Sequence, residues 1–167
     1  MTSKNIIFLD IDEVLCTSRS RAAYNSITAL DPICCKFLLQ LCEYENCKIV
    51  IHSSWRFFKE GIGTFISELN TACPELVNYI IQDENKRNTD VNIHGRAESI
   101  NNWLDKYINE EEVDNIVIID DLPVYFDGHL KYLESNFVKI TEPSLGFGLA
   151  DYYKAHRILR GDKKIDN

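Results

Sequence analysis

Acidic and hydroxyl side chains gather where three apolar runs of the sequence end. The set comprises Asp10 and Asp12, Ser53 and Ser54, and Asp120 and Asp121. If the three runs are parallel strands, their carboxyl ends meet at one edge of a sheet, where such sheets bind ligands. Four carboxylates at that edge would repel one another unless a cation lay among them. An all-oxygen donor set suits Mg²⁺ better than Zn²⁺, so the pattern predicts a magnesium site.

The spacing of the first two acids adds to this prediction. Asp10 and Asp12 are two positions apart, and alternate residues of an extended segment face the same way, so both can act on one substrate. A single Asp after a strand is more often a turn residue or a helix cap. Three strand ends that carry such residues together favour a functional site.

Strands must position these residues. The three runs are Asn5 to Ile11, Cys47 to His52, and Asn115 to Ile119. Each is rich in Ile and Val and apolar at nearly every position, which indicates parallel strands covered on both faces. Two weaker runs, Tyr79 to Gln82 and Phe137 to Ile140, are further candidate strands.

Helical patterns fill the segments between the runs. Asp31 followed by Pro32 predicts a helix start, and apolar residues continue from there at spacings of three and four. Similar spacings predict helices around Phe65 to Leu69, Ile100 to Ile108 and Leu149 to Leu159. Alternating strands and helices predict a three-layer, Rossmann-like α/β fold with a mainly parallel central sheet flanked by helices.

The order of these motifs resembles the haloacid dehalogenase (HAD) superfamily over nearly the whole chain. Residues 6–15, IIFLDIDEVL, look like its first motif, and residues 48–54, KIVIHSS, like its second. Residues 116–121, IVIIDD, look like the fourth. The third motif is a basic residue that opens the helix before the last of these strands, and Arg96 is our choice. Lys86 and Arg87 are its rivals.

Three short stretches are closest to the HAD domains of Swiss army knife RNA repair proteins. They are residues 53–56, SSWR; Arg96 with the helix that follows; and residues 146–149, GFGL. One departure from the superfamily is Glu13, because glycine is usual there, although relatives that dephosphorylate proteins also carry Glu. A second departure is Arg96, which stands where lysine is common.

The resemblance implies a two-step phosphatase mechanism. Asp10 would attack phosphorus and form an aspartyl-phosphate, while Asp12 would protonate the leaving oxygen and later take a proton from water. Ser53, or less plausibly Ser54, would hydrogen-bond the phosphoryl group, and Arg96 would offset its charge. The Asp12 backbone carbonyl and the Asp120–Asp121 pair would join Asp10 around Mg²⁺, with either acid of the pair as the direct ligand.

The spacing between motifs leaves little room for the cap domain that many members of this superfamily carry. Only 40 residues separate Asp12 from Ser53, and a predicted helix occupies much of that stretch. We therefore expect an absent or minimal cap and an open cleft, which suits a nucleic-acid end, a nucleotide or a protein side chain. Arg56 and Glu13 are candidate substrate contacts, and Arg56 is also a candidate member of a basic rim with Lys59, Arg19 and Arg21. We interpret Trp55 as a packing residue more readily than as a base-stacking one.

Composition sets the wider limits. The chain has 167 residues, a formal net charge of −8 and 45% hydrophobic residues, which predicts one domain, residues 1–167, without broad nucleic-acid binding. No apolar run approaches the roughly 20 residues of a membrane span. The six cysteines form no zinc-binding pattern and are expected to be reduced core residues in a cytoplasmic protein, with Cys16 the one nearest the predicted site. No partner protein is evident.

Two other classes fit less well. A receiver domain would carry its acidic pair after the first strand and its phosphorylated Asp after a middle strand, whereas here the middle strand ends in serines. A P-loop kinase would need GxxxxGK[ST], which the sequence lacks. The remaining alternative is a non-catalytic phosphate- or protein-binding module on the same fold.

Overall fold

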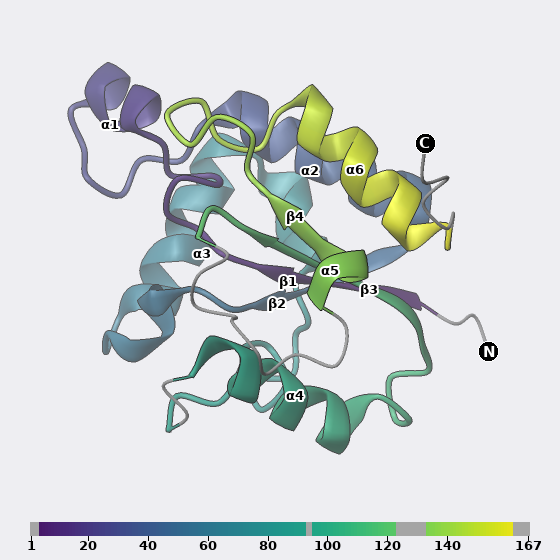
Figure 1. Cartoon of the computed structure of the whole chain (residues 1–167). Helices are drawn as coiled ribbons and strands as arrows, with labels where there is room; N and C mark the ends of the chain where they lie inside the picture. Colours follow the sequence, from purple (N-terminus) through teal and green to yellow (C-terminus); the bar gives the residue numbers. More distant parts are fainter. Residues whose placement is uncertain (1–3, 93–94, 123–132, 162–167) are drawn as a thin grey trace.

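A parallel sheet forms the centre of the chain (Figure 1). The structure is a computed structural model, and it describes residues 4–92, 95–122 and 133–161. The strands lie in the order β2-β1-β3-β4, and every neighbouring pair is parallel. They are β1 (Lys4–Leu9), β2 (Cys47–Ile51), β3 (Val113–Asp120) and β4 (Phe137–Lys139).

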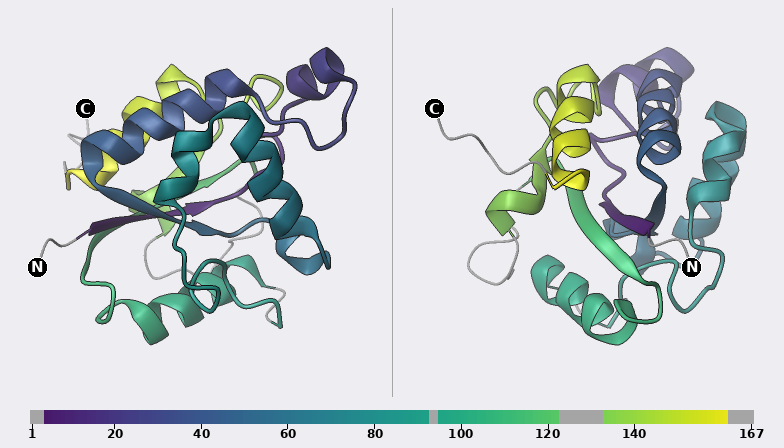
Figure 2. Two further views of the ribbon diagram at one scale, coloured as in Figure 1. Left: turned by 180° about the vertical axis from the view of Figure 1, so that it is seen from behind. Right: turned by 90° about the vertical axis from the view of Figure 1, so that its right-hand side faces the viewer.

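Helices cover both faces of this sheet (Figure 2). The α-helices are α1 (Ser18–Tyr24), α2 (Pro32–Glu45), α3 (Gly61–Ala72), α4 (Arg96–Tyr107), α5 (Leu133–Asn136) and α6 (Leu149–Leu159). Two 3₁₀ helices, η1 (Ser54–Phe57) and η2 (Pro74–Tyr79), flank α3. Figure 1 shows α4 on one side of the sheet and α2 and α6 on the other. This arrangement confirms the expected three-layer, Rossmann-like α/β fold.

Alternation along the strands divides the core into two layers. Ile7 and Leu9 of β1 belong to a large buried cluster with residues of α2, α3 and α6. Ile6 and Phe8 point to the other face and join the cluster under α4, where the Phe8 ring meets Trp103 edge-on at 5.4 Å. Because both faces of β1 are covered, its residues are apolar at consecutive positions.

All six cysteines are free thiols and buried in the large cluster. They are Cys16, Cys34, Cys35, Cys42, Cys47 and Cys73. The Cys16 Sγ lies 3.4 Å from the backbone oxygen of Ile27, and burial raises the pKa of its thiol. Cys16 is therefore a packing residue, although the sequence places it just beyond the first motif.

The structure corrects some expected element boundaries. The run from Tyr79 to Gln82 is not a strand, since η2 ends at Tyr79 and only an isolated bridge joins Ile80 to Ile49 of β2. The first strand ends at Leu9 rather than at Ile11, because the chain turns after Leu9. In this turn the amides of Val14, Leu15 and Cys16 donate to the Ile11 carbonyl. Asp31 caps α2 as expected, accepting a hydrogen bond from the Ile33 amide at 2.9 Å.

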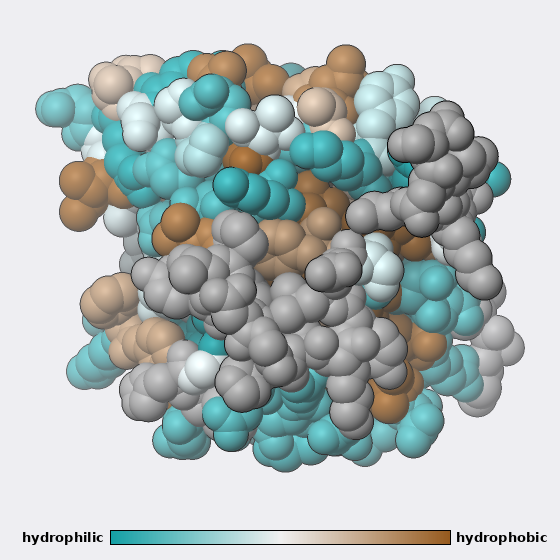
Figure 3. All heavy atoms as spheres, in the orientation of Figure 1, coloured by the Kyte–Doolittle hydropathy of each residue, from teal (hydrophilic) through white to brown (hydrophobic). Residues whose placement is uncertain are grey.

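Short elements fill the segments where a cap domain would be inserted. Residues 13–52 form α1, α2 and β2, and the described part of residues 55–95 forms η1, α3 and η2. Among the described residues these segments pack on the central domain and add no separate cap. On the face that Figure 3 shows, the hydrophobic residues that are described lie in small separate groups among hydrophilic ones. In the described part of the chain, no helix combines the length and apolarity needed to cross a membrane.

Candidate active site

Three carboxylates converge at the carboxyl ends of β1 and β3. Asp10 follows β1, Asp120 ends β3 and Asp121 comes next. One carboxylate oxygen from each lies within 4.8 Å of the others, a spacing that fits a shared metal ion. Parallel pairing of β1 with β3 brings them together, because Leu9 and Ile119 are paired in register. The expected meeting of the strand ends is therefore present.

Backbone amides orient the two buried acids in the same way. The Asp10 Oδ1 accepts from the Ile11 amide at 2.8 Å, and the Asp120 Oδ1 accepts from the Leu122 amide at 2.8 Å. The second oxygen of each, Oδ2, accepts from the Arg96 guanidinium, at 3.2 Å for Asp10. Each of the two carboxylates thus directs its Oδ2 toward the same cation, the Arg96 guanidinium.

Charge in this cluster is poorly compensated by the protein itself. Burial raises the pKa of Asp10, and the Arg96 guanidinium and hydrogen bonds from Ile11 and Ser53 oppose that change. Burial and then the neighbouring Asp10 carboxylate raise the pKa of Asp120 to about 7. Burial, followed by Asp10, also raises the pKa of Asp121. A divalent cation would stabilise all three ionised forms, and the all-carboxylate donor set fits one.

Arg96 is the basic residue that reaches the carboxylates. It is the first residue of α4, so the start of that helix sets its position. Lys86 instead pairs with Glu110 and Glu111. Arg87 donates to the backbone oxygens of Ile81 and Gln82. Of the three candidates that the sequence leaves open, Arg96 alone contacts Asp10 among the ion pairs of the described residues.

Ser53 and Ser54 occupy different positions at the end of β2. Ser53 is fully buried at the end of β2, beside Asp10, and it caps η1 by accepting a hydrogen bond from the Trp55 amide at 3.4 Å. The cap interpretation of Ser53 is therefore correct, and its contact with a phosphoryl group stays a prediction. Ser54 is the first residue of η1 and is half-buried.

Asp12 lies apart from the three clustered acids. Its Oδ1 accepts from the Arg21 Nη2 at 2.7 Å, and its Oδ2 accepts from the Trp55 Nε1 at 2.9 Å. Its side chain remains 41% exposed. The carboxylate is thus held by two donors in a position that solvent and a ligand can reach.

Glu13 adopts a backbone conformation that explains why glycine is usual at this position. Its φ is 54°, in the left-handed region, and its amide donates to the Cys16 carbonyl within the tight loop after Asp12. The Glu13 carboxylate pairs with Arg21, which also pairs with Asp12, and this contact offsets the cost of the left-handed backbone. Glu13 therefore helps to fix α1 over this loop.

Of the four basic residues expected at the rim, Arg56, Arg19 and Arg21 are engaged within the protein, and Lys59 is exposed. Arg56 is 5% exposed and donates to the backbone oxygens of His52 and Ser53, so it supports the β2 loop from within. Burial and the Arg96 charge lower the pKa of Arg56 to about 10. Arg19 pairs with Asp31. The expected rim is therefore wrong for Arg56, and Arg19 and Arg21 are engaged by acids.

Trp55 and Gly146 are the supporting residues that sequence reasoning missed. Trp55 is buried, as expected of a packing residue, yet its indole N–H also holds Asp12. Gly146 has φ 73°, and a Cβ there would lie 2.5 Å from the Val14 carbonyl oxygen. Only glycine allows this close approach to the loop after Asp12. Both residues stand in stretches that resemble RNA repair HAD domains, which was the available signal.

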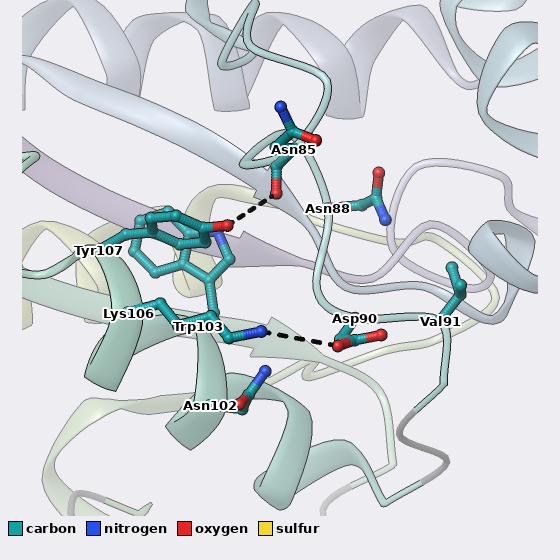
Figure 4. Close-up of a pocket in the computed structure, with 8 residues that line it drawn as sticks. All are labelled: Asn85, Asn88, Asp90, Val91, Asn102, Trp103, Lys106 and Tyr107. Carbon is teal, nitrogen blue, oxygen red and sulfur yellow. Dashed lines mark hydrogen bonds and ion pairs between the residues drawn. The ribbon is translucent and has the colours of Figure 1, made fainter.

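A separate hollow between residues 85–91 and α4 contains none of these groups (Figure 4). It measures about 260 Å³ and is lined by three asparagines, Trp103, Tyr107, Val91 and an Asp90–Lys106 ion pair. Its one carboxylate is paired, and Trp103 is only 2% exposed. Among the described residues, this hollow therefore offers no metal ligand set and no nucleophile.

Comparison with known proteins agrees with the geometry. No curated protein and no solved structure gives a significant match to the chain. The sequence profile of a family described as "HAD domain in Swiss Army Knife RNA repair proteins" matches residues 6–152. That span includes every residue of the site described above. The chain therefore belongs to this family of HAD domains.

Proposed function

We propose that the chain is a magnesium-dependent phosphatase that hydrolyses a phosphomonoester through an aspartyl-phosphate on Asp10. The observation that supports it best is the convergence of Asp10, Asp120 and Asp121 beside Arg96, with Ser53 buried at the end of the neighbouring strand. Membership in the HAD family supports hydrolytic phosphate chemistry. These are the groups that an in-line phosphoryl transfer needs.

Asp10 is the proposed nucleophile. Its carboxylate oxygen attacks phosphorus and forms an acyl phosphate as the bond between phosphorus and the leaving oxygen breaks. The Ile11 amide holds Oδ1, so the carboxylate has a fixed orientation before substrate arrives. Ser53 and Arg96 would each donate to the phosphoryl group and offset the charge that develops on it, an effect worth roughly 3 kcal/mol per donor.

Asp12 is the proposed acid and base. It gives a proton to the leaving oxygen in the first step, and in the second it takes a proton from the water that attacks phosphorus. The second step releases inorganic phosphate and returns Asp10 to its carboxylate form. Arg21 and Trp55 would hold Asp12 in place through both steps. Its partial exposure allows the leaving group to reach it.

Mg²⁺ would be held by Asp10, Asp120, Asp121 and the Asp12 backbone carbonyl. When bound it would polarise the phosphoryl oxygens and keep Asp10 ionised. Either Asp120 or Asp121 would supply the second carboxylate directly. The convergence of one oxygen from each of the three clustered carboxylates within 4.8 Å of the others supports a cation there.

A nucleotide or a nucleic-acid end is the proposed substrate class. The family description associates such domains with RNA repair, and the described residues add no cap over the cleft. The six buried free thiols support a reducing, cytoplasmic location.

The test is phosphate release from an aryl phosphate, nucleotides, and 5′- and 3′-phosphorylated oligonucleotides, with and without Mg²⁺. Wild type is expected to turn over at least one of them only with Mg²⁺, and Asp10→Asn is expected to lose activity by at least a thousandfold. Equal inactivity of a folded, Mg²⁺-binding wild type and of the variant across this panel would instead favour a non-catalytic phosphate-binding module.

A further inference from the structure

A second hollow opens directly beside Asp12. It measures about 350 Å³ and lies between residues 27–28, η1 and the first turn of α3. Its apolar wall is made by Ile27, Trp55 and Phe58, and Asp12 stands at its border with the active site. The Trp55 indole belongs to this wall and also donates to the Asp12 carboxylate, so one residue joins the hollow to the proposed acid.

Two large apolar side chains are held at the mouth of this hollow in contact with water. Ile27 is 84% exposed and Phe58 is 67% exposed. The Ile27 carbonyl accepts from the Arg21 Nε at 3.3 Å. The Phe58 amide donates to the Trp55 carbonyl, and its own carbonyl accepts from the Gly61 amide at 3.0 Å. Backbone contacts thus place both side chains where an apolar ligand would cover them.

The floor of the hollow depends on a close backbone approach. A Cβ at Gly61 would lie 2.0 Å from the Trp55 carbonyl oxygen, so only glycine lets α3 start against η1 here. Thr28 is fixed from the other side, since its hydroxyl donates to Glu68 of α3 at 2.8 Å. The hollow is therefore framed by contacts among three chain segments.

The proposed reaction requires the leaving group to lie next to Asp12. Proton transfer needs the leaving oxygen within hydrogen-bond reach of the Asp12 carboxylate. The atoms attached to that oxygen then extend away from the metal-binding carboxylates and past Asp12. The hollow that Asp12 borders is the adjoining space with apolar walls.

The charges of the residues that line the hollow determine which chemical groups it can bind. The described residues that line it include two acids, Asp12 and Glu60, and no Lys or Arg. A second phosphate would be repelled there, whereas a neutral ring would lie against Phe58 and Ile27. Glu60 and the Thr28 and Thr64 hydroxyls can hydrogen-bond polar groups at the edge of such a ring.

From these contacts we infer that the hollow binds a neutral aromatic ring belonging to the leaving group. This inference rests on the proposed phosphatase function and names its substrate class: monophosphate esters with an aromatic ring a few bonds from phosphorus. The nucleobase of a nucleoside monophosphate and a simple aryl group share this chemistry. Stacking of one ring on an aromatic side chain contributes roughly a factor of ten to binding.

Matched substrate pairs test the inference. Adenosine 5′-monophosphate is compared with ribose 5-phosphate, and 2-phenylethyl phosphate with n-butyl phosphate, so that each pair differs mainly in the ring. The expected kcat/KM ratio within a pair is roughly tenfold in favour of the ring. Preference in the first pair alone identifies a nucleobase, and preference in the second pair alone identifies a simple aryl group. Ratios near one in both pairs overturn the inference.

Variants locate the effect in this hollow. Phe58→Ala and Ile27→Ala remove exposed side chains and so should fold, and both are expected to move the ratio toward one. Tyr44→Ala removes a side chain that is 76% exposed on α2 and does not line this hollow. It is expected to keep the wild-type ratio. If Phe58→Ala keeps the wild-type kcat/KM ratio as Tyr44→Ala does, the assignment of the ring to this hollow is overturned.

A binding measurement separates this inference from the phosphatase proposal. Adenosine and 2-phenylethanol, which carry no phosphate, are titrated while tryptophan fluorescence is recorded, because Trp55 lines the hollow whereas Trp103 of α4 is buried in the core. Saturable quenching by either probe that weakens in Phe58→Ala supports the hollow even if no ester is hydrolysed. Absence of quenching by both overturns it even if every ester is hydrolysed equally well.

Discussion

At the scale of single residues, the Asp12 carboxylate depends on a neighbour that is not itself a proposed catalytic group. Trp55 is packed edge-on against Phe65 at 6.4 Å, so its indole N–H has a fixed direction toward Asp12. A hydrogen bond to a charged group contributes about 2 kcal/mol when it is partly shielded from water. Trp55 is therefore a positioning residue for the proposed acid and base.

Trp55→Phe keeps an aromatic ring in the core and deletes this hydrogen bond. We expect kcat to fall roughly tenfold with little change in KM, because the proposed acid and base loses a fixed orientation that binding of substrate does not need. Both constants are measured on n-butyl phosphate, which has no ring. Trp103→Phe is the matched control, since that indole donates to the Lys86 carbonyl, remote from Asp12. An equal loss of kcat in the two variants would contradict the positioning role.

Much of the candidate site could be predicted because its residues follow strands. Asp10, Ser53 and Asp120 meet as expected, since parallel pairing alone determines which strand ends are neighbours. The environment of Asp12 could not be predicted in the same way. Arg21 reaches it from α1, a seven-residue helix with only a weak signal, and Trp55 reaches it from η1. Such contacts depend on loop geometry that no periodicity encodes.

At the scale of elements, η1 and α3 meet in a close backbone contact beside the site. Gly61 begins α3 directly against the Trp55 carbonyl. Gly61→Ala would force these two backbones apart, and we expect the free energy of unfolding to fall by about 2 kcal/mol. Gly63→Ala lies two residues on, where a Cβ meets nothing within 4 Å. The free energy of unfolding of this control variant should instead rise by up to about 1 kcal/mol. Urea unfolding of both variants measures the difference, and equal stabilities would contradict the close contact.

An acid between α4 and β3 links distant elements and gives stability a pH dependence. Burial alone would raise the pKa of Glu111, but hydrogen bonds from Lys4 and Lys86 lower it below its ordinary value. Because the folded-state pKa is the lower one, the stabilisation is present above the unfolded pKa of about 4.3. It is lost as pH falls through the folded pKa.

Glu111→Gln is therefore expected to cost about 1 kcal/mol of unfolding free energy at pH 7. The difference from wild type should shrink as pH falls through the folded-state pKa, because wild-type Glu111 then becomes neutral as well. Urea unfolding at several pH values measures it. Glu43→Gln, an exposed acid on α2, serves as the control and should show no such trend. A constant difference at every pH would rule out the ionised Glu111 as its source.

Some elements could be predicted from the sequence and others could not. The helix from Leu149 to Leu159 agrees to the residue, and the short strand β4 lies within the expected run from Phe137 to Ile140. The expected strand from Tyr79 to Gln82 is wrong, because its apolar residues Ile80 and Ile81 pack beside β2 after a 3₁₀ helix, without a continuous ladder. Buried apolar runs of four residues fit either conformation, so tertiary packing decides.

At the scale of the whole molecule, metal binding should stabilise the fold through the edge where β1 and β3 end. At a Mg²⁺ concentration of about 100 times Kd, the gain is about 2.7 kcal/mol, which corresponds to roughly 5–10 °C in Tm for a chain of this size. Asp120→Asn is expected to lose most of that shift, because it removes a clustered carboxylate. Asp114→Asn, an exposed acid near the other end of β3, should retain it. Calorimetry with and without Mg²⁺ makes the comparison, and equal shifts in both variants would place the ion elsewhere.

The burial of all six thiols has a practical consequence for following the motions of this molecule. Burial raises the pKa of Cys34 to about 12 and that of Cys42 well above its ordinary value, so neither reacts appreciably while the fold is closed. Alkylation by a membrane-permeant reagent would then proceed only through opening events. Cys34 lies against the Leu145 backbone, whereas Cys42 and Cys47 lie at the opposite end of α2. Mass-resolved labelling of these positions would report separately on opening near the catalytic loop and on opening of the whole core, with no engineered probe.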